Sequence, residues 1–353
     1  MEDAVQQHKD QQDKNELLTW ACARGLLADA EAQVSGGADP HAVDKAGRRP
    51  LHYAAAHGHL KVVEFLITRG ADLEADDPSG RTALHYAALG RHLAVVSLLC
   101  ERGCWVDAPD ATDCTALHLA ARGLPPGPDD RAAARKAAGA GAASSPWATL
   151  GGGSGREGPW HSASGPLVRV LAAAGAALNS RNACGLSPAG EAVVAGNAHA
   201  LAVLVDLGAL ITPTYRGYTL LHLAAALGHS QCLERLLAAG RRPDLQEADN
   251  PEGLTPLHAA ALGGAGGCVA LLLDKGADAS MRCAAGRLPE ECLPPSPPPP
   301  APSSAASRPQ QLGSRPDQGQ AAWSSLRARL ATARAAAEAK HGKKGRRLSP
   351  RSA

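Results

Sequence analysis

The stretch TALHYAA at Thr82–Ala88 has four close copies in this chain of 353 residues. The copies read RPLHYAA, TALHLAA, TLLHLAA and TPLHAAA, and they start at Arg49, Thr115, Thr219 and Thr255. The first three histidines are spaced 33 residues apart, and most copies carry a Leu 14 residues and a Gly 18 residues after the His. A fixed period of this length predicts a solenoid of stacked repeats rather than one globular core.

The pattern resembles the ankyrin repeat, whose signature T-P-L-H-x-A recurs about every 33 residues. The resemblance covers roughly residues 17–293. It implies an all-α solenoid of about seven repeats, with short β-hairpin loops between them. The motif Thr or Ser suits the N-cap of an inner helix, and paired Ala residues let neighbouring inner helices stack closely. By the same resemblance, the motif histidines are structural residues that link adjacent loops: His52, His85, His118, His222 and His258.

Two weaker copies and one insertion complete the register. Leu17–Gly25 resembles an N-terminal capping repeat, and SPAGEA at Ser187–Ala192 is a copy that lacks the His. The distance between the third full motif and this copy exceeds one period by 39 residues. The excess predicts a disordered Pro/Gly/Ala/Ser-rich insert at about 124–165, inside the fourth repeat. A truncated unit at Gly286–Leu293 would close the C-terminal end of the array.

The composition argues against several other classes of protein. Aromatic residues make up 3% of the chain, too few for an ordinary aromatic core. The polar start Met1–Glu16 does not resemble a signal peptide, and no run of 18 apolar residues predicts a transmembrane helix. Nine Cys without a CxxC pair fit reduced thiols in the cytosol or nucleus rather than a structural zinc site. We find no catalytic constellation, and expect no enzyme activity, cofactor, metal or small-molecule substrate.

Charge and composition change at the ends of the predicted array. We expect a polar N-terminal segment at 1–16, a Pro/Ser-rich linker at 294–318 and a basic, largely disordered tail at 319–353. Residues 301–353 carry a net charge of +9, and the rest of the chain carries −7. Apolar residues spaced three and four apart predict one short amphipathic helix in the tail: Trp323, Leu326, Leu330, Ala333 and Ala337.

The end of the tail contains candidate targeting and modification signals. Lys343, Lys344, Arg346 and Arg347 form a compact basic cluster, which is typical of nuclear localisation signals and of patches that bind anionic surfaces. Ser349 follows this cluster and is a candidate phosphosite. The tail has little aromatic interleaving for base stacking, so direct binding of nucleic acid is not expected.

By the resemblance, partners bind at hairpin tips and along the exposed side of the inner helices. The best candidate group is Tyr215, Arg216 and Tyr218, because Tyr and Arg are enriched in interface hot spots. Acidic residues recur at the tips, which favours a basic protein partner. The chain's own basic tail could fold back there and compete with that partner. The other candidate contact residues are Arg48, His57, Arg81, Leu227 and Glu252.

These features indicate a non-enzymatic scaffold or adaptor that binds proteins in the cytoplasm, the nucleus or both. One alternative is the substrate-recognition subunit of a ubiquitin ligase, although Ser325–Leu330 only weakly resembles the adaptor box of such subunits. Another is a nuclear regulator that binds a transcription factor. An enzyme with an accessory array is disfavoured, because the insert and the tail are too short and too polar to hold a catalytic domain.

Overall fold

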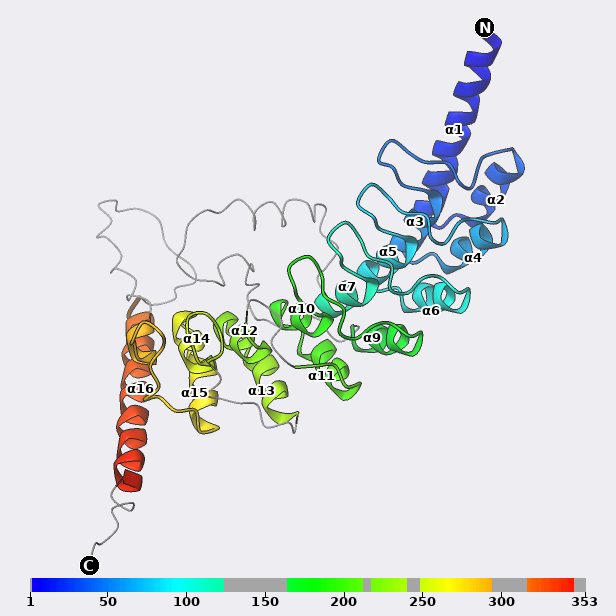
Figure 1. Cartoon of the computed structure of the whole chain (residues 1–353). Helices are drawn as coiled ribbons and strands as arrows, with labels where there is room; N and C mark the ends of the chain where they lie inside the picture. Colours follow the sequence, from blue (N-terminus) through cyan, green and yellow to red (C-terminus); the bar gives the residue numbers. More distant parts are fainter. Residues whose placement is uncertain (1, 124–163, 212–216, 240–247, 294–315, 346–353) are drawn as a thin grey trace, which may run out of the picture. The chain divides into compact units, whose positions relative to one another are not determined.

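The described part of the chain is built from helices and the turns between them (Figure 1). None of these residues belongs to a strand, and only Tyr218 forms an isolated bridge. The expected β-hairpin loops are therefore tight turns without strands in this part of the chain. No helix here is long and apolar enough to cross a membrane. The computed structural model describes residues 2–123, 164–211, 217–239, 248–293 and 316–345.

The chain divides into two compact units. Unit 1 comprises Met1–Gly141 and Arg156–Tyr215, and unit 2 comprises Ala142–Gly155 and Arg216–Ala353. In the described residues of unit 1, consecutive helices pack in five pairs. The pairs are α1 (Glu2–Arg24) with α2 (Leu27–Ser35), α3 (Pro50–Ala56) with α4 (Leu60–Thr68), α5 (Ala83–Gly90) with α6 (Leu93–Glu101), α7 (Ala116–Arg122) with α9 (Ser164–Ala173), and α10 (Pro188–Val194) with α11 (Ala198–Asp206).

Helix α1 continues without a break across the boundary expected between residues 16 and 17. Residues 124–163, which include most of the expected insert, fall between α7 and α9 in sequence and lie outside the described residues. Helix α9 then supplies Leu167, Val168 and Leu171 as buried side chains. The fourth repeat therefore keeps an outer helix despite the long stretch inside it.

Unit 2 contains two further helix pairs and a C-terminal cap. Helix α12 (Leu220–Leu227) pairs with α13 (Ser230–Ala238), and α14 (Pro256–Leu262) pairs with α15 (Gly266–Asp274). A short 3₁₀ helix, η1 (Pro289–Cys292), packs on α14. The last helix, α16 (Pro316–Gly345), contacts both α15 and η1.

The tail differs from the sequence prediction. A short helix within a disordered segment was expected, but α16 is 30 residues long. Leu326 and Leu330 of the predicted apolar stripe are 6% and 1% exposed. Arg334 also pairs with Glu290 of η1. The two leucines of the stripe are therefore buried where α16 contacts α15 and η1, and this burial favours an ordered helix over a solvated segment.

Small side chains make the thin layers of the array possible. Ala54, Ala55, Ala87 and Ala88 on the inner helices α3 and α5 are at most 1% exposed. A Leu near the end of the outer helices fills the space between the two helices of a pair, and it is buried at Leu66, Leu99, Leu171, Leu204, Leu236 and Leu272. Because small Ala side chains let the inner helices approach closely and Leu and Val fill the rest of each layer, an Ala-rich and Phe-poor chain can still form a packed core.

The motif histidines connect each repeat to the next loop. In the third repeat, the Nδ1 of His85 lies 3.0 Å from the hydroxyl of Thr82, and its Nε2 lies 3.1 Å from the carbonyl oxygen of Cys114. Burial lowers the pKa of His52, His85, His118 and His258 below the ordinary value, which keeps these imidazoles neutral. The other Nε2 contacts are His52 to Ala75 O, His118 to Leu186 O, His222 to Leu254 O and His258 to Arg287 O.

A second set of hydrogen bonds between repeats was not predicted from the sequence. His59 and His92 stand directly before α4 and α6, and their Nε2 atoms contact the carbonyl oxygens of Ala23 and Ala56 at 3.0 and 2.9 Å. Asn197 has the same role before α11, where its Nδ2 donates to Ala121 O at 3.0 Å. These bonds tie the starts of α4, α6 and α11 to the end of the inner helix of the preceding repeat.

Candidate protein-binding surface

In six of the described turns between repeats, one residue, which we call the turn residue, is hydrogen-bonded through its backbone or its side chain to the residue four positions on. In the turn before α5, one carboxylate oxygen of Asp77 accepts hydrogen bonds from the backbone N–H groups of Ser79 and Arg81 at 2.8 and 3.0 Å. The backbone N–H of Asp77 in turn donates to Arg81 O at 3.0 Å. This geometry fixes the turn and the direction of the side chains around it. The described turn residues are Asp44, Asp77, Asp110, Asn182, Asn250 and Cys283.

The residue nine positions after the turn residue, which we call the i+9 residue, lies beside it. Tyr53 donates its hydroxyl proton to Asp44 Oδ2 at 2.5 Å, and Tyr86 donates to Asp77 Oδ2 at 2.7 Å. Burial raises the pKa of both carboxyl groups, but the hydrogen bonds from the tyrosines and the backbone outweigh it, so both pKa values lie below the ordinary one. Burial and the bond to Asp77 raise the pKa of Tyr86 to about 12.

Arg48 lies between the two tyrosines. Its guanidinium carbon is 5.7 Å from the ring centroid of Tyr53 and 5.7 Å from that of Tyr86. Both distances are within the range of cation–π attraction. Arg48 therefore joins the second repeat to the third, and it is a half-buried residue rather than a freely projecting contact.

A groove lies between α1 and the first turn in unit 1. It encloses about 730 Å³. We call it the N-terminal groove, and the residues that line it are Gln11, Gln12, Asn15, Glu16, Thr19, Trp20, Ala23, Ala42, Val43, Asp44, Lys45 and Tyr53. Its floor thus includes the Asp44–Tyr53 pair described above.

Two apolar side chains stay exposed at this groove. Trp20 is 49% exposed and Val43 is 58% exposed. The guanidinium carbon of Arg24 lies 4.8 Å from the Trp20 ring centroid. On the rim, Lys45 and Glu16 form a solvent-exposed ion pair at 3.4 Å. A large exposed aromatic in a groove with charged side chains around it has the composition of a protein-contact site.

The sequence signal for Trp20 and Val43 was weak. Trp20 follows a polar segment in which an aromatic is unusual, but a Trp in a degenerate repeat copy does not by itself predict a contact residue. Val43 directly precedes the turn residue Asp44, and the sequence of a single turn does not indicate which of its side chains are exposed to solvent. The exposure of both depends on α1, whose length was not predicted.

A buried ion pair joins the fourth and fifth repeats. Arg122 Nε lies 2.9 Å from Glu191 Oε2, and Asn182 Nδ2 donates to Glu191 Oε1 at 2.7 Å. The side chain of Glu191 is 5% exposed. Because a buried carboxylate needs such partners, this network is a structural link across the repeat that lacks the motif His.

The structure separates the predicted contact residues into different groups. His57 and Glu252 are exposed, and Leu227 is half-buried. Arg81 is engaged with Asp110, with Nε and Oδ2 3.4 Å apart. Tyr218 corrects the sequence analysis: it is 2% exposed and packs edge-on against His222, so it is a core residue rather than a contact residue. Tyr215 and Arg216 lie outside the described residues.

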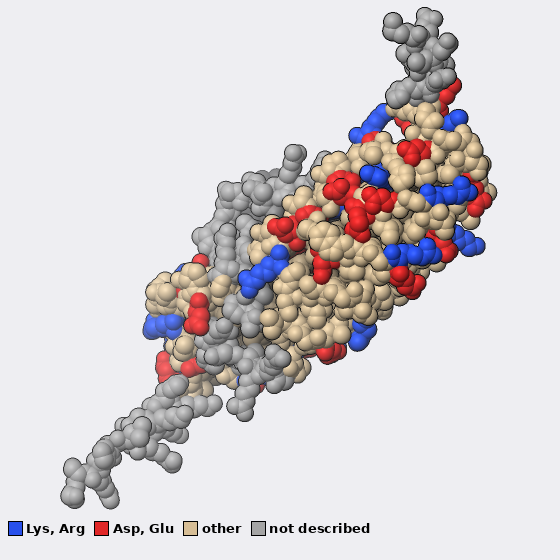
Figure 2. Space-filling view, turned by 45° about the vertical axis from the view of Figure 1, so that its right-hand side comes forward, with Lys and Arg blue, Asp and Glu red and all other residues tan. Residues whose placement is uncertain are grey.

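Charged side chains of both signs lie on the face shown in Figure 2, and the acidic ones form a visible group in its upper half. In the described range of the tail, α16 contacts α15 and η1, and a contact between the basic tail and the hairpin tips stays a prediction. The side chains of Lys343 and Lys344 lie outside the described residues, as do Arg346, Arg347 and Ser349 entirely. Nuclear targeting and phosphorylation stay predictions.

Comparison with known proteins identifies the family. The family model for ankyrin repeats (3 copies) matches residues 18–110, 70–125, 160–247 and 212–283. The chain therefore belongs to the ankyrin repeat family. In a crystal structure, the human ASB11 ankyrin repeat domain is similar with a TM-score of 0.54 and 26% sequence identity, over 70% of this chain and 93% of that one.

A curated relative gives a narrower match. The probable E3 ubiquitin-protein ligase XBOS32 of Oryza sativa subsp. japonica is 33% identical over 158 residues, which cover 35% of this chain. The match spans 32% of the length of the rice protein. Ankyrin repeats are modules for protein–protein interaction, and this general role is the one that the match to the family supports.

Proposed function

We propose that this chain is a non-enzymatic adaptor that binds a protein partner in the N-terminal groove of unit 1. The carrying observation is the half-exposed Trp20, which lines the groove together with the exposed Val43. A partner segment that inserts an apolar side chain between them would bury area that water now covers. Glu16 and Lys45 on the rim would then favour a segment with polar flanks.

A site of this kind fits the rest of the unit. The turn residues, the i+9 tyrosines and Arg48 hold the groove floor in one conformation, because each is bonded to a neighbouring repeat or to its own turn. A preformed surface loses little entropy on binding. A location in the cytoplasm or the nucleus is part of this proposal, and it is supported by the absence of a CxxC pair among the nine Cys and by the basic cluster at the end of the tail.

The experiment is proximity labelling in cells with the full chain and with a Trp20→Ala/Val43→Asp variant. We expect a subset of labelled proteins to lose at least about 5-fold in recovery with the variant, since an apolar anchor contributes about 1–3 kcal/mol to binding. Trp105→Ala is the matched control, because Trp105 is an exposed tryptophan, at 61%, outside the groove. Equal labelling by all three chains would contradict the proposal.

A second candidate function is substrate recognition for a ubiquitin ligase. It is favoured by the similarity to a probable E3 ubiquitin-protein ligase over 158 residues. Precipitation of the full chain followed by detection of cullin and elongin components distinguishes this role from that of a plain adaptor. Recovery of these components, lost on deletion of residues 316–345, would support the ligase role, and their absence would leave the plain adaptor.

A further inference from the structure

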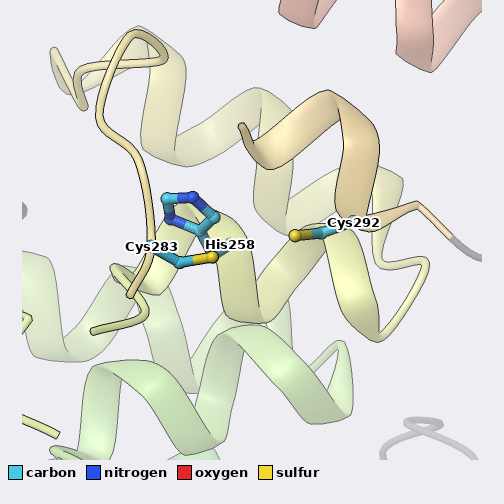
Figure 3. Close-up of side chains that lie close together, drawn as sticks. All are labelled: His258, Cys283 and Cys292. Atoms are coloured by element: carbon cyan, nitrogen blue, oxygen red, sulfur yellow. The ribbon is translucent and has the colours of Figure 1, made fainter. Parts of the chain in front are cut away.

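Three potential metal ligands meet at the C-terminal end of the repeat array (Figure 3). The Sγ atoms of Cys283 and Cys292 and a ring nitrogen of His258 all lie within 4.8 Å of one another. His258 belongs to α14, Cys292 belongs to η1, and Cys283 lies in the turn between α15 and η1. The three residues are 0%, 4% and 6% exposed, for His258, Cys292 and Cys283 respectively. The cluster thus lies under the cap of the array, within unit 2.

The repeat geometry accounts for this meeting. Cys283 is a turn residue, and its backbone N–H donates to Arg287 O at 3.0 Å as in the other turns. Cys292 is its i+9 residue. In three other repeats this pair is Asp44 with Tyr53, Asp77 with Tyr86 and Asn182 with Glu191, and each of those pairs is hydrogen-bonded. The last turn therefore has two thiols at positions that the fold brings into contact.

The same geometry brings the third ligand. In the preceding turn, Asn250 Nδ2 lies 3.5 Å from His222 Nε2, so a turn residue lies beside the motif His of the repeat before it. In the last turn that His is His258. Its Nδ1 lies 2.8 Å from the Thr255 hydroxyl, and its Nε2 lies 3.1 Å from Arg287 O, which also accepts from the N–H of Cys283. Nε2 therefore faces the turn that carries Cys283.

We propose that His258, Cys283 and Cys292 form a Zn²⁺ site that fastens η1 and the last turn to α14. Thiolate and imidazole are the ligands that zinc prefers, and a tetrahedral ion holds them about 3.5–3.8 Å apart, given bonds of about 2.3 Å to sulfur and 2.0 Å to nitrogen. The cluster needs only a small contraction to reach such distances. Water would take the fourth position.

The protons balance as follows. The two thiols release their protons to solvent as their sulfur atoms bind the ion. The proton on Nε2 of His258 goes to solvent and Nδ1 takes one from solvent, so the imidazole stays neutral. Arg287 O then loses the hydrogen bond from Nε2, and Nδ1 no longer accepts from the backbone N–H of Thr255, while the hydroxyl of Thr255 turns to accept from Nδ1–H. Arg287 O keeps the hydrogen bond from Cys283. The ion replaces the hydrogen bond between turn residue and i+9 residue that three other repeats possess.

The test uses the reduced full chain, first freed of metal, and measures Zn²⁺ by equilibrium dialysis and Co²⁺ by absorbance. We expect one equivalent of Zn²⁺ per chain, a thiolate-to-cobalt charge-transfer band, and a higher thermal midpoint with Zn²⁺. The key variant is Cys283→Asn/Cys292→Ala, which copies the Asn250/Ala259 pair of the preceding turn and should fold. It should lose the bound ion, the band and the thermal shift.

Cys184→Ser is the matched control, because Cys184 is an exposed thiol outside the cluster. It should bind like the parent chain. The proposal is wrong if the parent chain binds no stoichiometric Zn²⁺, or if the folded double variant keeps the same equivalent. It is also wrong if Cys283 and Cys292 of the parent chain form a disulfide with each other that persists under reducing conditions and no metal binds.

Discussion

The turn before α5 and the turn before η1 have the same backbone geometry but different side chains. In the first, the turn residue and the i+9 residue are Asp77 and Tyr86, which share a hydrogen bond of 2.7 Å. In the second they are Cys283 and Cys292, which lie beside a motif His. The backbone bond from the turn residue to the residue four positions on is 3.0 Å in both. The repeat therefore determines which side chains meet, and the residue types determine what they can do.

Acidification should have the largest effect, because it acts on four buried imidazoles at once. Their pKa values lie below 6.5 in the folded chain, so the unfolded chain binds more protons as the pH falls below about 6.5. Stability is therefore full above this pH and decreases as the pH falls toward the folded pKa values. Urea unfolding followed by circular dichroism at pH 7.5 and 5.5 measures it, and an unchanged midpoint would contradict the neutral-histidine interpretation.

A single linking histidine should be the next most costly to remove. His118 is 0% exposed, and its Nε2 contacts Leu186 O at 3.1 Å across the longest gap in sequence between two repeats. His118→Ala leaves a cavity and an unpaired carbonyl, and should cost about 3 kcal/mol of unfolding free energy. The exposed His57→Ala is the control, with a change within about 0.5 kcal/mol. Equal effects of the two variants would show that the link is unimportant.

The cap of unit 2 should depend on α16 to a smaller extent. Leu330 is 1% exposed, and Leu330→Ala should lower the stability of unit 2 by about 2 kcal/mol. Arg329→Ala, at an exposed neighbouring position, should change little. Hydrogen exchange of α15 and η1 is the measurement, and the expected result is faster exchange in the leucine variant only. Slow exchange in both variants would mean that α16 does not hold the cap.

The hydrogen bond in the acidic turn should have the smallest effect. Tyr86→Phe removes the donor to Asp77 and should cost about 1 kcal/mol at neutral pH. The bond also helps to lower the pKa of Asp77, so the variant should raise that pKa toward 3.8. The stability from this carboxylate is present above pH 3.8 and is lost as the pH falls through the folded pKa, so acid unfolding should begin at a higher pH in the variant. Identical acid transitions would contradict this.

The sequence predicted the repeat and its period because the motif Thr, His and Ala positions carry the packing of the array. The resemblance also implies a turn-stabilising Asp eight positions before the motif His, and Asp44, Asp77 and Asp110 have this role in the structure. The length of α16 was missed, because an apolar stripe of a few residues does not show whether a surface will cover it. The His258 cluster was missed because the zinc criterion was close spacing in sequence. Here the repeat brings residues 25 and 34 positions after a motif His into contact with it.

The most direct test of this account is to move the cluster to another repeat. Asp110 and Leu119 stand 25 and 34 positions after His85, as Cys283 and Cys292 do after His258. We would introduce Asp110→Cys/Leu119→Cys into the chain that already carries Cys283→Asn/Cys292→Ala, and titrate it with Co²⁺. The account predicts that one equivalent binds again with its thiolate charge-transfer band. A folded chain that binds no ion, while the parent chain binds one, would contradict the claim that equivalent positions in different repeats meet in the same way.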